Sequence, residues 1–109
     1  MRALLIEIRS TEIVDVPEDP MGALTYLKDL VGGWIESIPM PMNCHAFINE
    51  EGKLIGLPIN PLATTLYNLA VHGSDMVAGN AVVFGPPNED GDETPVTDEF
   101  LTFVKEIRK

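Results

Sequence analysis

NEEGKLIGLPINPLATTLYN, residues 49–68, decides the fold class because it joins a predicted hairpin to a predicted helix. The letters EEG are typical of a tight bend, and we expect Gly52 in this bend to adopt a positive φ. Apolar residues on both sides of the bend predict two short strands, residues 44–49 and residues 53–57. The stretch therefore begins with an antiparallel hairpin.

The second half of the same stretch, GLPINP, predicts a stiff connection into a helix. Proline disfavours helical backbone angles in the residue before it, so Leu57 and Asn60 are expected to be extended. Asn60 is a preferred N-cap residue, and Pro61 fits the first helical position, where no N–H is needed. The buried face of this helix is expected to consist of Leu62, Leu66, Leu69 and Ala70.

Two further segments carry helix signals of the same kind. Asp19 and Pro20 predict a helix start, and Gly32 or Gly33 predicts its end with a positive φ. Near the C-terminus, Thr97 predicts an N-cap, with acids in the first turn and bases in the last, which complements the helix dipole. The buried face of this last helix is expected to consist of Phe100, Phe103, Val104 and Ile107.

Short runs of apolar and β-branched residues predict the remaining strands. RALLIEIR and EIVDV predict an N-terminal hairpin over residues 2–16, and the prolines near the end of WIESIPM place that strand at a sheet edge. AVVFG predicts a short buried strand, and the acidic loop PPNEDGDETP follows it. We therefore predict a single α+β domain over residues 1–109, with a mainly antiparallel sheet of about five or six strands and three helices packed on it.

The composition is that of an ordinary globular domain. The chain has 109 residues, of which 45% are hydrophobic and 22% are charged, and this length suits one domain. Its single cysteine excludes an intramolecular disulfide, and no apolar run reaches the roughly 18 residues of a membrane span. The expected location is the cytoplasm, without membrane association.

The charge is unusual, with a net value of −10 and no Lys or Arg between Leu54 and Val104. Such a surface repels nucleic-acid phosphates, so direct nucleic-acid binding is not expected. The charge suits a basic protein partner, and it equally suits an acidic face that is only solvated. The candidate partner-binding residues are the acids of the loop: Glu89, Asp90, Asp92 and Glu93.

Residues that carry catalysis or bind metals are scarce. Cys44, His45 and His72 are the only soft metal ligands, whereas a structural zinc site needs four. Adjacent residues on a strand point to opposite faces, and no local motif supports a nucleophilic pair of Cys44 and His72. The chain has no phosphate-loop motif, and its acidic loop lacks the ligand spacing of a calcium loop. We predict no catalytic residues, no metal and no cofactor.

Three stretches resemble an uncharacterised protein family: LVGGWIE at residues 30–36, NEEGKLIGLPINPLA at 49–63 and MVAGNAVVFG at 76–85. The family is a domain of unknown function in small proteins of bacteria, notably actinobacteria, and of their phages and mobile elements. The resemblance covers about half of the chain, and it implies no activity and no catalytic residues. It implies a phage-borne accessory protein that binds a host component.

The centre of the chain offers a candidate ligand site. Trp34, Lys53, Asn60 and Tyr67 combine aromatic walls with a few polar groups, and Glu36 lies on the strand that follows Trp34. If these residues converge, they form the kind of cleft that binds a small molecule, such as a nucleotide-like signal. The alternative is that Asn60 only caps its helix and that Lys53 only solubilises a hairpin.

Two functional hypotheses follow. In the first, the protein binds a host protein with a basic surface through its acidic residues, and can inhibit it. In the second, it is a small-molecule binder or sponge. An enzyme is the least favoured interpretation. Met40, Met42 and Trp34 lie near the proline-rich edge, and they would favour self-association if they are exposed. The sequence equally allows these three residues to be buried.

Overall fold

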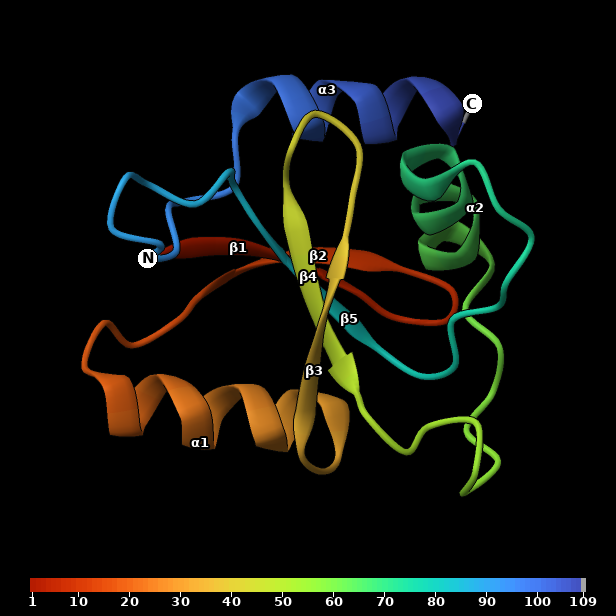
Figure 1. The fold of residues 1–109 in the computed structure, drawn as a ribbon, viewed down its shortest axis with the longest axis horizontal. Helices are drawn as coiled ribbons and strands as arrows, with labels where there is room; N and C mark the ends of the chain where they lie inside the picture. The colour runs from red at the N-terminus through yellow and green to blue at the C-terminus, as the bar shows by residue number, and fades with distance from the viewer. Residues whose placement is uncertain (109) are drawn as a thin grey trace.

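The computed structural model describes residues 1–108, which form a five-stranded antiparallel sheet with three helices (Figure 1). None of the helices in these residues is long and apolar enough to cross a membrane. Along the chain, the elements are β1 (Arg2–Ile6), β2 (Thr11–Asp15), α1 (Pro20–Val31), β3 (Ile35–Pro39), β4 (His45–Asn49), α2 (Pro61–Val71), β5 (Ala81–Phe84) and α3 (Asp98–Ile107). The predicted α+β class is confirmed.

The order of the strands in the sheet is β2-β1-β5-β4-β3. The last strand in sequence, β5, lies in the centre, where Val83 is opposite Leu4 of β1 on one side and Ala46 of β4 on the other. All four residues of β5 are buried, as its run of Val and Phe predicts. The proline-ended strand β3 lies at the edge, which confirms the prediction made for WIESIPM.

Helices cover both faces of the sheet. Because side chains alternate between the two faces along each strand, each face has a hydrophobic core of its own. Figure 1 shows α1 and α3 on opposite sides of the strands. The core under α2 and α3 includes Leu4, Ile6, Leu66, Val83 and Phe100. The core under α1 includes Leu5, Leu27, Val31, Val82 and Phe84.

All three predicted N-caps are confirmed. The Asp19 side chain accepts a hydrogen bond from the Gly22 N–H, Asn60 accepts one from Ala63, and Thr97 accepts one from Phe100. Gly32 ends α1 in the left-handed conformation, with a φ of 83°.

The predicted strand over residues 53–57 is wrong. Both edges of β4 are paired, one with β3 and the other with β5, so no edge remains for a second hairpin arm. The chain instead forms consecutive turns, in which the Leu57 N–H donates to the Gly52 carbonyl over 2.9 Å. The positive φ, 75°, belongs to Gly56 and not to Gly52. Gly52 is buried, and a Cβ built there would lie 2.9 Å from the Ala78 carbonyl oxygen.

Some apolar side chains are less buried, or more buried, than the patterns predict. Leu69 of α2 is 50% exposed and Ile107 of α3 is 37% exposed, whereas Ala63 and Leu66 form the buried line of α2. Near the proline-rich edge, Met40 is buried. The polar contacts of α2 are described next.

Candidate functional site

The first candidate site is a pocket of about 340 Å³ between β3, β4, α2 and the segment over residues 75–78, here called the central pocket. Its lining includes three of the predicted ligand-binding residues, Glu36, Lys53 and Tyr67. These residues are distant in sequence, so the fold brings them together. Its other lining residues are Ile38, Ile48, Asn49, Glu50, Gly52, Leu54, Asp75, Met76, Val77 and Ala78.

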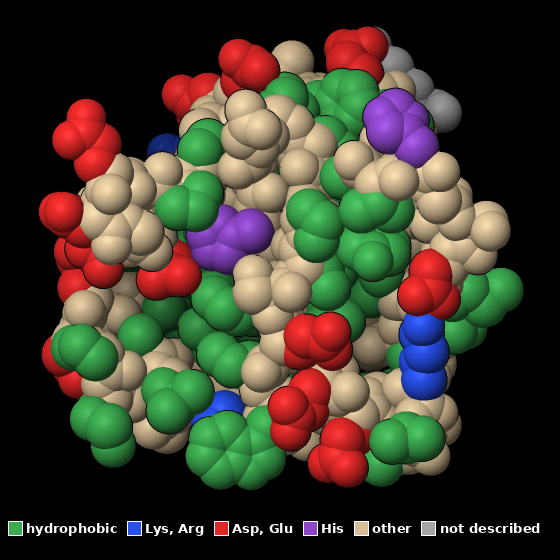
Figure 2. Space-filling view, viewed as in Figure 1, with side chains coloured by type: hydrophobic (Ala, Val, Ile, Leu, Met, Phe, Trp, Pro, Cys, Tyr) green, Lys and Arg blue, Asp and Glu red, His purple; other side chains and the backbone are tan. Residues whose placement is uncertain are grey.

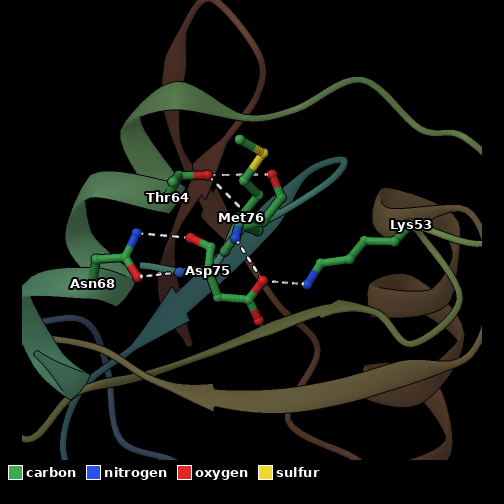
Figure 3. A network of polar contacts seen from close by, with 6 residues as sticks. Lys53, Thr64, Asn68, Asp75 and Met76 are labelled. Atoms are coloured by element: carbon green, nitrogen blue, oxygen red, sulfur yellow. Dashed lines mark hydrogen bonds and ion pairs between the residues drawn. The ribbon is translucent and has the colours of Figure 1, made fainter. Parts of the chain in front are cut away.

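The polar side of the central pocket is organised around Asp75 (Figure 3). Its carboxylate accepts hydrogen bonds from the Lys53 ammonium over 2.6 Å and from the Met76 N–H over 2.8 Å. The hydrogen bond from Lys53 and that from the Met76 backbone lower the pKa of Asp75 below its ordinary value. The Lys53 ammonium is thus already paired within the protein.

The segment that carries Asp75 is held by a row of polar side chains on α2 and at its cap. Asn60, Thr64 and Asn68 are spaced four residues apart, so they lie on one face of the helix. Asn68 bonds both the N–H and the carbonyl of Asp75 (Figure 3), and Thr64 accepts from the Val77 N–H over 2.9 Å. These side chains tie α2 to the segment over residues 75–79, whereas Leu69 of the same helix is exposed.

Asn60 is a structural residue in this arrangement. Its side chain is fully buried, and its amide donates to the carbonyls of Ile6 and Gly79, each over 2.9 Å. Its carbonyl oxygen accepts the capping bond from Ala63, so its hydrogen-bonding groups face the protein. The predicted convergence of Asn60 with Lys53 and Tyr67 in one cleft is therefore wrong, because Asn60 faces the core.

Trp34 also lies outside the central pocket. Its side chain is 58% exposed, and the Lys28 ammonium lies 3.7 Å from a ring centroid, which is a cation–π contact. Trp34 lies just before the first residue of β3, Ile35, and it does not line the central pocket. Of the two, only Glu36 forms a wall of this pocket together with Tyr67.

The second candidate site is a groove of about 550 Å³ between the start of α1, the sheet and the acidic loop, here called the acidic groove. Its floor is apolar and aromatic, and three acids, Glu18, Asp92 and Glu93, line it together with that floor. Figure 2 shows the acidic side chains along the left margin of the molecule, beside a recess floored by hydrophobic side chains. The remaining lining residues are Met1, Val16, Pro17, Pro20, Ala23, Leu24, Leu27, Ile35, Phe47 and Phe84.

An aromatic cluster lies beside this floor. The His45 ring stacks on Phe84 at a centroid distance of 6.0 Å and meets Phe47 edge-on at 5.4 Å. His45 Nε2 lies 3.4 Å from a carboxylate oxygen of Glu93, so the loop contacts the sheet here. His45 Nδ1 is buried and has no hydrogen-bond partner within residues 1–108.

The acidic loop has a defined shape. The Asn88 side chain accepts hydrogen bonds from the N–H groups of Asp90 and Asp92, and the Gly85 N–H donates to the Thr94 carbonyl at the base of the loop. Of the four predicted partner-binding acids, Asp92 and Glu93 line the acidic groove, whereas Glu89 and Asp90 are exposed on the loop outside it.

The family model described as Domain of unknown function (DUF3846) matches residues 1–108. The chain belongs to the DUF3846 family. The match confirms the predicted resemblance to a domain of unknown function and extends it over the N-terminal hairpin and the acidic loop. Comparisons with curated proteins and with solved structures give no match.

The soft ligands of this DUF3846 domain do not form a reactive group. Cys44 is buried beside the turn between β3 and β4, and burial raises the pKa of its thiol, which disfavours the nucleophilic thiolate at neutral pH. His72 is the exposed C-cap of α2, in a left-handed conformation. Across the part of the chain that the structure describes, no three His, Cys, Asp or Glu side chains gather as metal ligands.

Two features of the DUF3846 domain were missed at the level of sequence. The polar row on α2 has a signal in the sequence, the four-residue spacing of Asn60, Thr64 and Asn68. The buried face of this helix was instead predicted from its hydrophobic residues alone. The acidic groove has no local signal, because its floor joins β4 and β5 to α1 and its rim comes from two distant loops.

Proposed function

We propose that this DUF3846 domain acts by binding a partner protein with a basic surface, and that it is not an enzyme. One observation carries the proposal. The carboxylates of Glu89, Asp90 and Asp92 leave one hydrogen-bonded loop toward solvent, and none of them has an ion-pair partner among the described residues. Unpaired charges of one sign attract a complementary surface and accelerate association.

The surroundings of the loop support the same partner. Glu18 lies with Asp92 and Glu93 along the acidic groove, and Figure 2 shows Asp and Glu side chains also grouped at the lower centre of this face. Nearby positive charge is limited, because the N-terminal ammonium is held 2.6 Å from Asp15 and 4.0 Å from Glu18. This surface disfavours nucleic acid as a partner, since phosphates carry the same sign.

The biological setting that we propose is that of a phage- or mobile-element-encoded accessory protein acting in the host cytoplasm. Binding alone suffices for such a protein to inhibit a host component, and no catalytic group is needed. The proposal does not depend on self-association: a second copy also carries ten net negative charges, which opposes pairing through the same face.

The proposal is tested by affinity capture from bacterial lysate at low and moderate salt. The bait is either the native protein or the variant with Glu89→Gln, Asp90→Asn, Asp92→Asn and Glu93→Gln. A basic protein captured by the native chain, lost with the variant and weakened by salt supports the proposal, because salt screens exposed charges beyond about 8–10 Å. Equal capture by both baits at both salt concentrations contradicts it.

A second candidate function is favoured by the central pocket, which brings Glu36, Lys53 and Tyr67 together. Its lining has three carboxylates, those of Glu36, Glu50 and Asp75, against one ammonium that is already paired. That balance favours a cationic or zwitterionic small molecule over a nucleotide.

Thermal unfolding with a panel of amines, amino acids and nucleotides tests this second function. A ligand present at about 100 times its dissociation constant adds about 2.7 kcal/mol of stability. The native chain is compared with Glu36→Gln and with Glu12→Gln, an exposed strand acid outside the pocket. A shift that only Glu36→Gln abolishes supports the function, and unshifted melting across the panel excludes these ligands.

A further inference from the structure

We propose that the acidic groove binds an amphipathic cationic segment of the partner, with apolar side chains on the groove floor and Arg or Lys beside the acidic rim. This inference rests on the proposed function and adds the chemistry of the segment that is recognised. The acidic surface alone selects only for charge. The groove adds a requirement for apolar side chains at a fixed place.

The floor of the groove can hold apolar side chains because its own residues are packed in place before a ligand binds. Phe84 and Leu27 are 2% and 5% exposed, so they form a packed base, while Leu24, Ile35 and Phe47 are half-buried and still offer apolar surface. The T-shaped contact between Phe47 and Phe84, with centroids 5.8 Å apart, fixes the orientation of the two rings. A rigid floor lowers the entropy lost when a ligand binds.

The volume of the groove suits a short segment. At about 550 Å³ it is within the usual range of roughly 300–1,000 Å³ for ligand sites. It is bounded by α1 on one side and by the acidic loop on the other. In grooves that bind peptides, a few apolar anchors on one face of the peptide enter the site.

The rim decides the charge of the occupant. Glu18, Asp92 and Glu93 come from two segments distant in sequence, and His45 and the N-terminal ammonium are the cationic or titratable bases beside them. Each of these bases already faces a carboxylate, so the rim as a whole keeps an excess of negative charge. A second copy of this chain and an anionic membrane surface are both disfavoured on that ground.

The test uses a fluorescein-labelled synthetic helix-forming peptide with leucines along one face and arginines on both flanks. A matched peptide has serine at each leucine position. Affinities are measured by fluorescence anisotropy at two salt concentrations. The leucine peptide is expected to bind the native chain more tightly than the serine peptide, and that difference is expected to survive at the higher salt, because apolar contacts are not screened.

Two pairs of variants locate the binding. Glu18→Gln with Asp92→Asn removes two charges from the groove, and Glu89→Gln with Asp90→Asn removes two charges outside it. Leu24→Ala trims the groove, and Leu30→Ala trims a half-buried leucine elsewhere on α1. We expect each groove variant to weaken leucine-peptide binding by about 5- to 10-fold and Leu30→Ala by less than about 2-fold. The Glu89 and Asp90 pair also attracts the peptide by charge, so its removal is expected to weaken binding by a smaller factor of about 2- to 3-fold. Circular dichroism confirms that all four variants are folded.

The outcomes separate the two proposals. Equal weakening by both charge pairs, with equal affinity for the two peptides, overturns the groove inference but leaves binding through the acidic surface in place. Absence of binding to the leucine peptide also overturns the groove inference, while affinity capture tests the proposed function independently. Peptide binding that no acidic variant weakens counts against both.

Discussion

Replacement of Asn60 by alanine is the sharpest test of how this fold is held together. The substitution removes the N-cap of α2, which contributes about 1 kcal/mol. It also leaves the buried carbonyls of Ile6 and Gly79 without their donor, at about 1–2 kcal/mol each. The expected loss in the free energy of unfolding is therefore about 3–5 kcal/mol, a large part of the roughly 5–15 kcal/mol typical of a domain.

The assay is urea unfolding followed by circular dichroism, with Asn68→Ala as the matched control. Asn68 is also an asparagine of the polar row, and its side chain makes two hydrogen bonds to the backbone of Asp75, but these bonds are exposed. Its replacement is expected to cost about 1 kcal/mol or less. A loss in the free energy of unfolding below about 1 kcal/mol for Asn60→Ala would refute the structural role of Asn60.

Three further predictions concern individual side chains. Gly22→Ala should lower stability by about 0.5–2 kcal/mol in thermal unfolding, although alanine favours helices, because its Cβ would lie 2.6 Å from Oδ1 of Asp19 and 2.8 Å from Oδ2, the oxygen that accepts the capping bond; a gain in stability would contradict this. Lys53→Met should raise the carboxyl pKa of Asp75 toward its ordinary value in an NMR titration. Because the pKa of Asp75 is lowered in the native protein, the Lys53–Asp75 pair stabilises the fold at pH values above the pKa that this carboxyl has in the unfolded chain. This contribution should disappear as the pH falls through the native pKa of Asp75. An unchanged titration of Asp75 in Lys53→Met would show that the pair does not form. Cys44 should react slowly with iodoacetamide at neutral pH until the chain unfolds, since burial raises its pKa, and rapid alkylation of the native protein would show an accessible thiolate.

Local signals in the sequence predict the helices and most strands well. Asp19, Asn60 and Thr97 cap the three helices as predicted, because capping depends on residues within one turn. The run AVVFG is correctly predicted as buried, since apolar runs on both faces occur only in covered strands.

The failures have a common physical cause, which is competition between distant segments. Residues 53–57 have the composition of a strand, yet β5 takes the edge of β4 that they would need. No residue near position 53 in the sequence indicates that β5 lies between β1 and β4 in the sheet. The central pocket and the acidic groove depend on the same strand order. The sequence therefore predicts only part of the central pocket and two of the three acids of the acidic groove, Asp92 and Glu93.

The central claim is that an exposed acidic surface selects a basic partner. The most direct measurement is the dissociation constant of the captured partner for the native chain and for the variant with Glu89→Gln, Asp90→Asn, Asp92→Asn and Glu93→Gln, each at two salt concentrations. Neutralisation is predicted to weaken binding and to flatten its dependence on salt. An affinity that is the same for both proteins, with the same salt dependence, would contradict the claim.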